Sequence, residues 1–272
     1  MYKIVRVNAT NSCSNYYAET IQALLLGSCS SSSNPDKKCR KADALAVYDS
    51  NGSLKTVIYN PSVTWTQVGN DYYVDLLFTD SSTNSYNASY IKLYGRNMND
   101  PQQSSYYYEL VKLQLPQSIN KSGSDTLKIH VSIGFPVFNS SSPSSRMLWT
   151  FVFPLQNLLR DGYDIYNTPF NQWKFVNSNL NVLATFTASG RTAVSGTYPG
   201  TSYPYLGVQF QDTVNVTSNY TVYGLMLDYQ NNGGYAIYWL GGQSVSSGSH
   251  TLSMTIVQVY YYNGTNGFSS TY

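Results

Sequence analysis

In the segment LKIHVSIGF, residues 127–135, every second side chain from Leu127 to Phe135 is apolar, and the residues between them are polar or, at Gly134, glycine. This period of two is typical of a β-strand that buries one face, because successive side chains point to opposite sides of a sheet. The segment LSMTIVQV, residues 252–259, begins in the same phase at Leu252. The two segments predict equivalent strands in two halves of the chain.

Three further blocks of the first half recur in the same order in the second half, at offsets that fall from 138 to 126. A duplication of this length indicates two domains rather than a solenoid of short repeats. We expect them at residues 1–138 and 139–272, joined at a Ser- and Pro-rich stretch. One large sandwich whose low-complexity composition mimics repetition is the alternative. The matched blocks are Leu45–Tyr48 (leading to Gly52) with Leu183–Phe186 (leading to Gly190), Leu76–Asp80 with Val208–Asp212, and Gln117–Ser118 with Gln243–Ser244.

Short runs rich in Val, Ile, Thr, Tyr and Phe alternate with turn-forming clusters such as DSNG at residues 49–52. This pattern predicts an all-β fold of two tandem antiparallel β-sandwich domains, jelly-roll-like in style. One short N-terminal helix is expected from Tyr16 to Leu26. Ser14 or Asn15 would cap its start and Gly27 would end it. Residues 154–160 are a second helical candidate.

Charged residues make up only 11% of the chain, whereas 27 of its 272 residues are Tyr. With 14 acidic residues and a net charge of +2, the chain has few carboxylates to lose in acid, which fits an acid-stable protein. The basic cluster Lys37, Lys38, Arg40 and Lys41 has no interleaved aromatic residues. We interpret it as a solvated loop and expect no nucleic-acid partner.

The chain carries few residues suited to catalysis or metal binding. Cys13, Cys29 and Cys39 allow one disulfide with a thiol left over; Cys29 with Cys39 closes the shortest loop, but the spacing does not decide the pairing. His130 and His250 stand in no catalytic motif, and no phosphate-binding, dinucleotide-binding or zinc-protease pattern occurs. We expect no catalytic residue, no metal and no cofactor.

Paired carboxylates are the remaining chemistry to weigh, because two of them can hydrolyse a glycosidic bond. Asp80 and Asp212 occupy matching positions of the repeat, and Asp161 and Asp164 lie close together in sequence. A repeated Asp at a strand end is more commonly the acceptor that closes a turn. We therefore expect Asp80 and Asp212 to be structural.

Two surface features are candidates for modification and association. Eight Asn-X-Ser/Thr sequons are candidate glycosylation sites, and Asn87 and Asn219 are equivalent in the repeat. Two Tyr tracts place rings on both faces of a strand, which suggests a subunit interface or a platform for sugars. The sequons lie at Asn8, Asn51, Asn87, Asn120, Asn139, Asn215, Asn219 and Asn263, and the tracts are Tyr106, Tyr107, Tyr108 and Tyr260, Tyr261, Tyr262.

No targeting segment or membrane span is expected. Residues 1–7 have the pattern of a strand, and the apolar run at residues 23–26 is far shorter than a span requires. We expect synthesis in a host cytoplasm without a signal peptide. Release by another route, such as assembly into a particle, would then bring the protein outside.

In its low charge, its abundance of Tyr, Ser, Asn and Thr, its sequons and its duplicated β-domains, the chain resembles virion structural proteins of viruses that infect hyperthermophilic acidophilic archaea. The resemblance implies a non-enzymatic capsid, turret, vertex or tail component, exposed on the virion and associating with copies of itself and other virion proteins. An extracellular carbohydrate- or receptor-binding module, with host surface glycans as partners, is one alternative. A glycoside hydrolase is a second.

Overall fold

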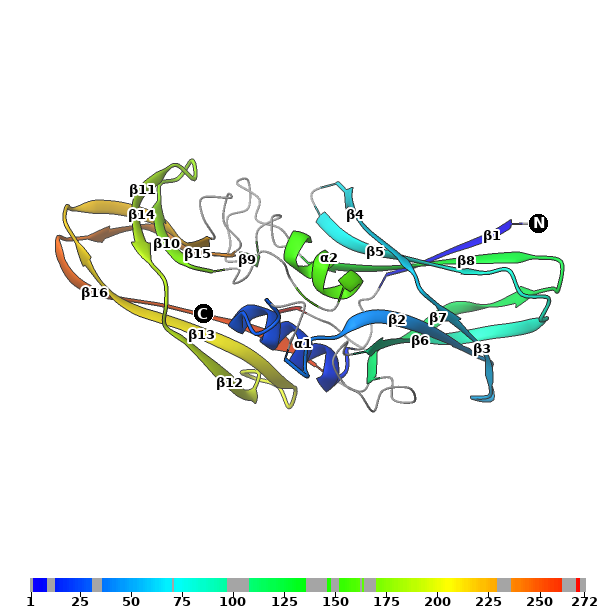
Figure 1. Cartoon of the computed structure of the whole chain (residues 1–272). Helices are drawn as coiled ribbons and strands as arrows, with labels where there is room; N and C mark the ends of the chain where they lie inside the picture. The colour runs from blue at the N-terminus through cyan, green and yellow to red at the C-terminus, as the bar shows by residue number, and fades with distance from the viewer. Residues whose placement is uncertain are drawn as a thin grey trace.

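The computed structural model of the chain describes residues 2–8, 13–30, 36–69, 71–96, 108–135, 146–147, 152–161, 163, 170–228, 236–260 and 268–269. These residues form strands in four sheets and two helices, which confirms the all-β prediction (Figure 1). All described strand pairs are antiparallel except β1 with β8.

The first half forms two four-stranded sheets, in the orders β1-β8-β5-β4 and β3-β2-β6-β7. We call them sheet A and sheet B. Their strands are β1 (Tyr2–Asn8), β2 (Lys41–Tyr48), β3 (Leu54–Tyr59), β4 (Ser62–Val68), β5 (Asp71–Asp80), β6 (Tyr86–Arg96), β7 (Tyr108–Lys121) and β8 (Thr126–Phe135).

The second half repeats this plan with a five-stranded sheet C, in the order β11-β10-β14-β15-β9, and a four-stranded sheet E, in the order β12-β13-β16-β17. The described strands of each half pair only with strands of the same half. The strands are β9 (Arg146–Met147), β10 (Gln172–Val176), β11 (Val182–Thr187), β12 (Arg191–Thr197), β13 (Pro204–Val216), β14 (Tyr220–Asp228), β15 (Ala236–Val245), β16 (Gly248–Val259) and β17 (Phe268–Ser269).

Strand register confirms most of the predicted repeat. Asp80 of β5 lies opposite Leu127 of β8, and Asp212 of β13 lies opposite Leu252 of β16. The offsets of 132 and 125 therefore match one strand pair to its counterpart. The predicted alternation also holds, since Leu127 and Leu252 are both buried.

The match of Leu45–Tyr48 to Leu183–Phe186 was wrong. Leu45–Tyr48 lies in β2, which pairs with β3 and β6, whereas Leu183–Phe186 lies in β11, which is an edge strand. In the second half, β10 occupies the sheet position that β2 has in the first half, and β11 occupies the position of β3. The neighbouring strands of the hairpin have similar apolar runs, so the run of β2 resembles that of β11 although β10 is its counterpart.

The loops of these two hairpins give the correct offset of 128. In the β2–β3 loop, the Asp49 side chain accepts hydrogen bonds from the N–H groups of Asn51 and Ser53. In the β10–β11 loop, DSNGS is replaced by NSNLN, residues 177–181, and the Asn177 side chain makes the same pair of bonds. Both loops contain a residue with positive φ, which is Gly52 in the first and Leu180 in the second. The loop at residues 177–181, which is the counterpart of DSNGS, therefore lacks the glycine that would have identified it in the sequence.

Helix α1 (Asn15–Leu26) has the caps that its sequence predicted. The Ser14 hydroxyl accepts a hydrogen bond from the Tyr17 N–H at 3.2 Å, and Gly27 ends the helix in the left-handed conformation at φ 75°. The second candidate segment is also helical, as α2 (Val152–Asp161). The predicted domain boundary between residues 138 and 139 lies outside the described residues and stays a prediction.

Each helix packs against the half of the chain to which it does not belong in sequence. Helix α1 contacts β12, β13 and β16 of the second half, and α2 contacts β2, β4 and β5 of the first. Both helices lie at the centre of the elongated molecule, between the two pairs of sheets (Figure 1). A single apolar cluster runs through both halves and includes Leu24 of α1 and Leu155 of α2.

Hydrogen bonds from helix side chains to strand backbones accompany this exchange. The buried Gln22 amide of α1 donates to the carbonyl groups of Val194 and Gly207, at 3.1 and 2.8 Å. In the reciprocal contact, the Gln156 amide of α2 donates to the Val63 carbonyl of β4 at 3.3 Å. Strands β4 and β12 hold equivalent positions in sheets A and E, so each helix bonds the corresponding edge strand of the other half.

We predict that Gln22→Leu lowers the free energy of unfolding by about 1–3 kcal/mol, because two buried carbonyl groups lose a donor. Urea denaturation followed by Trp fluorescence measures this change. Gln156→Leu is the matched control. It should cost less, because Gln156 is only half-buried and makes one longer bond. Equal stability of Gln22→Leu and the parent would contradict this account of the exchange.

Candidate interaction surface

The outer face of sheet B carries a stack of alternating Tyr and Lys side chains. Tyr48 of β2 and Tyr90 of β6 lie opposite each other, with ring centroids 4.8 Å apart and planes 2° from parallel. The Lys92 ammonium lies 5.6 Å from the centroid of the Tyr48 ring, and the Lys112 ammonium lies 5.0 Å from that of Tyr90. Each ring therefore meets another ring and a cation, which are favourable partners for aromatic faces.

The stack continues along β6 to Tyr94. The hydroxyl groups of Tyr48 and Tyr94 are 3.4 Å apart, and Lys92 forms a 2.7 Å ion pair with Glu109 of β7. Burial and the contact with Tyr48 raise the pKa of Tyr94 well above its usual range, so this ring stays neutral. We call Tyr48, Tyr90, Lys92, Tyr94 and Lys112 the tyrosine–lysine stack.

A second Tyr cluster lies where α1 meets sheet B. Tyr16 and Tyr108 are 4.9 Å apart between centroids, and the Arg40 guanidinium lies 5.2 and 4.4 Å from their respective rings. Tyr108 is thus half-buried against its own chain. Tyr260 is also half-buried, and its N–H donates to the Pro204 carbonyl. The other tract members, Tyr106, Tyr107, Tyr261 and Tyr262, lie outside the described residues.

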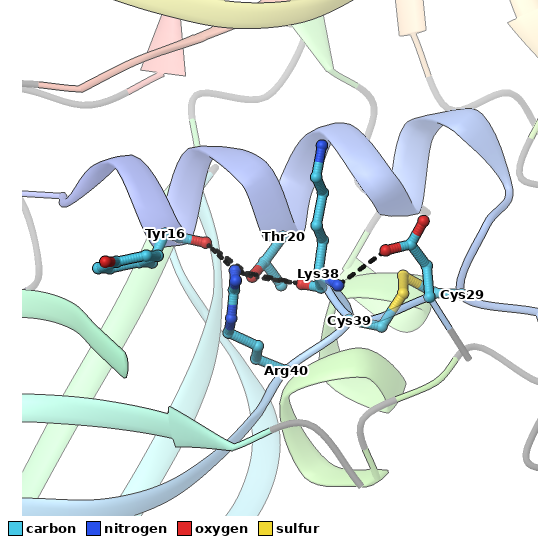
Figure 2. The surroundings of a disulfide bond; sticks show 7 residues. Tyr16, Thr20, Cys29, Lys38, Cys39 and Arg40 are labelled. Carbon is cyan, nitrogen blue, oxygen red and sulfur yellow. Dashed lines mark hydrogen bonds between the residues drawn. A yellow bond between two sulfur atoms is a disulfide. The ribbon is translucent and has the colours of Figure 1, made fainter. Parts of the chain in front are cut away.

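Arg40 was wrongly assigned to a solvated loop, since only 4% of it is exposed. Its guanidinium donates to the Tyr16 carbonyl at 2.9 Å (Figure 2). It also forms an ion pair with Glu19 at 3.0 Å. These bonds hold the strand that leaves the loop against the side of α1. Lys37 and Lys38 are exposed, as expected, whereas Lys41 is half-buried at the start of β2 and is ion-paired to Asp43 at 2.9 Å. The burial of Arg40 had no sequence signal, because this residue stands within a short basic cluster that also contains Lys38 and Lys41.

A disulfide joins Cys29 to Cys39 beside this arginine (Figure 2). It closes the loop between α1 and β2, the shortest pairing that the spacing allowed. Thr20 of α1 donates to the Lys38 carbonyl at 2.9 Å and so ties the same loop to the helix. Cys13 is a free, partly buried thiol, and burial raises its pKa to about 12. It is therefore a poor nucleophile.

The repeated carboxylates hold the backbone in two ways, since Asp80 closes its own turn whereas Asp212 holds the β11–β12 connection against β13. Asp80 accepts hydrogen bonds from the Ser82 N–H at 2.9 Å and the Tyr86 hydroxyl at 2.5 Å. Asp212 accepts from the Trp173 indole at 2.7 Å and from the Gly190 N–H at 2.9 Å. Burial opposes ionisation, but these donors outweigh it and lower the pKa of both carboxyl groups. Each carboxylate is bonded within its own half.

The two histidines also have local partners. His130 Nδ1 lies 2.9 Å from a carboxylate oxygen of Asp75, whose other oxygen accepts from the Ser132 hydroxyl at 2.8 Å. In this order the serine contacts the aspartate rather than the histidine, so the imidazole does not activate the hydroxyl. His250 bonds the Ser246 carbonyl at 2.8 Å within its own turn. Its counterpart, Asp125, closes the equivalent turn by accepting from the Ser122 N–H.

Five sequon asparagines have described side chains, and all five are exposed: Asn51, Asn87, Asn120, Asn215 and Asn219. Asn87 lies opposite Asn120 beside the β7–β8 turn, and Asn215 lies opposite Ser249 near the start of β16. The β7–β8 turn and the start of β16 lie at opposite ends of the molecule (Figure 1). Nothing is described of the side chains of Asn8, Asn139 and Asn263.

Within the described residues, no group of three or more His, Cys, Asp or Glu side chains is placed to hold a metal ion. In the same part of the chain, neither helix has the length and apolar character needed to cross a membrane. Asp161 is ion-paired to Arg160 at 2.6 Å, and Asp164 lies outside the described residues. No family model, no curated protein and no solved structure matches the chain.

We predict that Asp212→Asn lowers the free energy of unfolding at pH 7 by about 1–3 kcal/mol. The Asn side chain replaces one accepting oxygen by an NH2 group, which cannot accept from the N–H donors around it. The folded-state pKa of Asp212 is lowered, so its stabilisation is present above about pH 4 and is lost as the pH falls through the folded pKa. Urea titrations at pH 7 and in strong acid should therefore show a difference between variant and parent that shrinks in acid.

Asp161→Asn is the control, since the ion pair of this partly exposed side chain with the exposed Arg160 contributes little to stability. A deficit of Asp212→Asn that is the same at both pH values would contradict the assignment of Asp212 as a charged hydrogen-bond acceptor.

Proposed function

We propose that the chain is a non-enzymatic structural protein of a virus particle, assembling through its β-sandwich domains into a capsid or surface appendage. The observation that carries the proposal is that equivalent polar positions in the two halves serve the backbone. Asp49 and Asn177 organise equivalent hairpin loops, and Asp80 and Asp212, at equivalent strand positions, both accept hydrogen bonds from backbone N–H groups of connecting segments. The duplication has thus retained the groups that maintain architecture.

The tyrosine–lysine stack supports a structural surface more than a sugar-binding one. A sugar stacks on an open ring face, but Tyr48 and Tyr90 cover each other and are also contacted by Lys92 and Lys112. Such a closed layer loses little conformational freedom when another protein packs on it, because its side chains are already ordered. This favours copies of the same chain and other virion proteins as partners over host glycans.

The placement of the sequons fits exposure on the outside of a particle. Asn87 and Asn120 lie at one end of the molecule, Asn215 and Asn219 at the other, and Asn51 lies in the β2–β3 loop. Glycans at the two ends would leave surface between them available for contacts. The few carboxylates and the lowered pKa of Asp80 and Asp212 are compatible with an acidic exterior.

The direct test is a mass-spectrometric inventory of virus particles purified from the source culture. The proposal predicts the chain in many copies per particle, with added hexose mass on peptides that contain Asn87 or Asn219. Particles that lack the chain, together with a free monomer of the chain in the culture, would overturn it.

A further inference from the structure

Five edge strands, β1, β3, β9, β11 and β17, have no described strand beyond them, and β3 and β11 are a pair of these that the repeat makes equivalent. Among the described residues, β4 and β12 are contacted by α2 and α1, and β15, β8 and β16 are extended by β9, β1 and β17. The outer side of β7 is met by Cys13, which forms a bridge with Val111, and by Ser14, whose N–H donates to the Leu110 carbonyl. Strands β3 and β11 end sheets B and C with no described strand beyond them.

These two open strands are equivalent in the repeat. Each has six residues, follows a five-residue loop of the same hydrogen-bonding pattern and pairs with its neighbour through a register shift at the same place. Each begins with an exposed apolar residue, Leu54 at 54% and Val182 at 51% exposure. A strand edge with exposed apolar side chains is a template for pairing with another chain.

The backbone groups at the open edge of β3 follow from its pairing with β2. Tyr59 and Ala44 lie opposite each other, and the Asn60 N–H donates to the Asp43 carbonyl at 3.0 Å. Tyr59 and Ala44 are therefore a pair that exchanges no backbone hydrogen bond. Because backbone groups of alternate residues point to opposite sides of a strand, the N–H and C=O of Val57 point away from β2.

Strand β11 has the same arrangement. The Ala188 N–H donates to the Asn171 carbonyl at 2.9 Å, so Thr187 and Gln172, which lie opposite each other, exchange no backbone hydrogen bond. The N–H and C=O of Thr185 therefore point away from β10. Val57 and Thr185 are counterparts at the offset of 128, so the two edges present matching donors and acceptors.

We propose that β3 of one copy pairs with β11 of a second copy, joining sheet B of the first to sheet C of the second. The inference rests on the proposed function, because it names the contact through which copies assemble. The pair is antiparallel in this arrangement, because Val57 and Thr185 placed opposite each other then exchange both of their outward backbone hydrogen bonds. Backbone hydrogen bonds supply the contact, as when a peptide strand is added to a sheet edge.

Charge favours pairing of β3 with β11 over pairing of β3 with itself. Strand β3 carries Lys55, which is ion-paired to Asp49 at 2.7 Å, whereas the sequence of β11, VLATFT, has no charged residue. Two copies of β3 would bring two Lys55–Asp49 ion pairs to one short interface, whereas a β3–β11 contact brings only one charged pair and sets it against an uncharged strand. Because each copy has one β3 and one β11, the pairing is head to tail and produces rings or filaments.

The test uses Val57→Pro and Thr185→Pro in the full chain. Proline removes one N–H that points to the open edge and makes no bond within its own sheet, so the fold should be retained. Sedimentation velocity should show parent oligomers that grow with concentration, and each single variant should be a monomer. A 1:1 mixture should form a dimer of one copy of each variant, because Val57→Pro retains β11 and Thr185→Pro retains β3.

Val57→Thr and Thr185→Val are the matched controls, which keep the N–H and should assemble as the parent does. Circular dichroism reports whether each proline variant is folded, and Val57→Lys with Thr185→Lys replaces any variant that is not. Parent assembly that persists in both single variants, or a Val57→Pro variant that dimerises alone, overturns the inference and leaves the proposed function standing. A parent that stays monomeric at its highest soluble concentration overturns the inference, while the particle inventory decides the proposed function separately.

Discussion

The exchange of helices between the two halves is the contact on which the rest of the structure depends. Helix α1 buries Ile21 and Leu24 and directs Gln22 to the backbone of sheet E, while α2 packs on strands of the first half. A helix that is apolar on most sides is stable only where it is surrounded. Neither sandwich therefore completes its core with its own helix alone, and the open edges and the tyrosine–lysine stack are held in place by the combined unit.

The sequence predicted what local chemistry determines. The alternation around Leu127 and Leu252, the Ser14 and Gly27 caps, and the offset that relates Asp80 to Asp212 all correspond to the structure. The hairpin match was wrong because Leu180 occupies the positive-φ position that Gly52 occupies in the first half. The burial of Arg40, the reciprocal helix packing and the tyrosine–lysine stack depend on contacts between distant segments. Only the stack had a signal, the alternation of Tyr90, Lys92 and Tyr94 with apolar neighbours.

Differential scanning calorimetry of the full chain tests the interdependence of the halves most directly. If the exchanged helices join the two sandwiches into one unit, the chain unfolds in a single transition whose calorimetric enthalpy equals its van't Hoff enthalpy. Two resolved transitions, or a calorimetric enthalpy about twice the van't Hoff value, would show that the sandwiches unfold independently and would contradict this account.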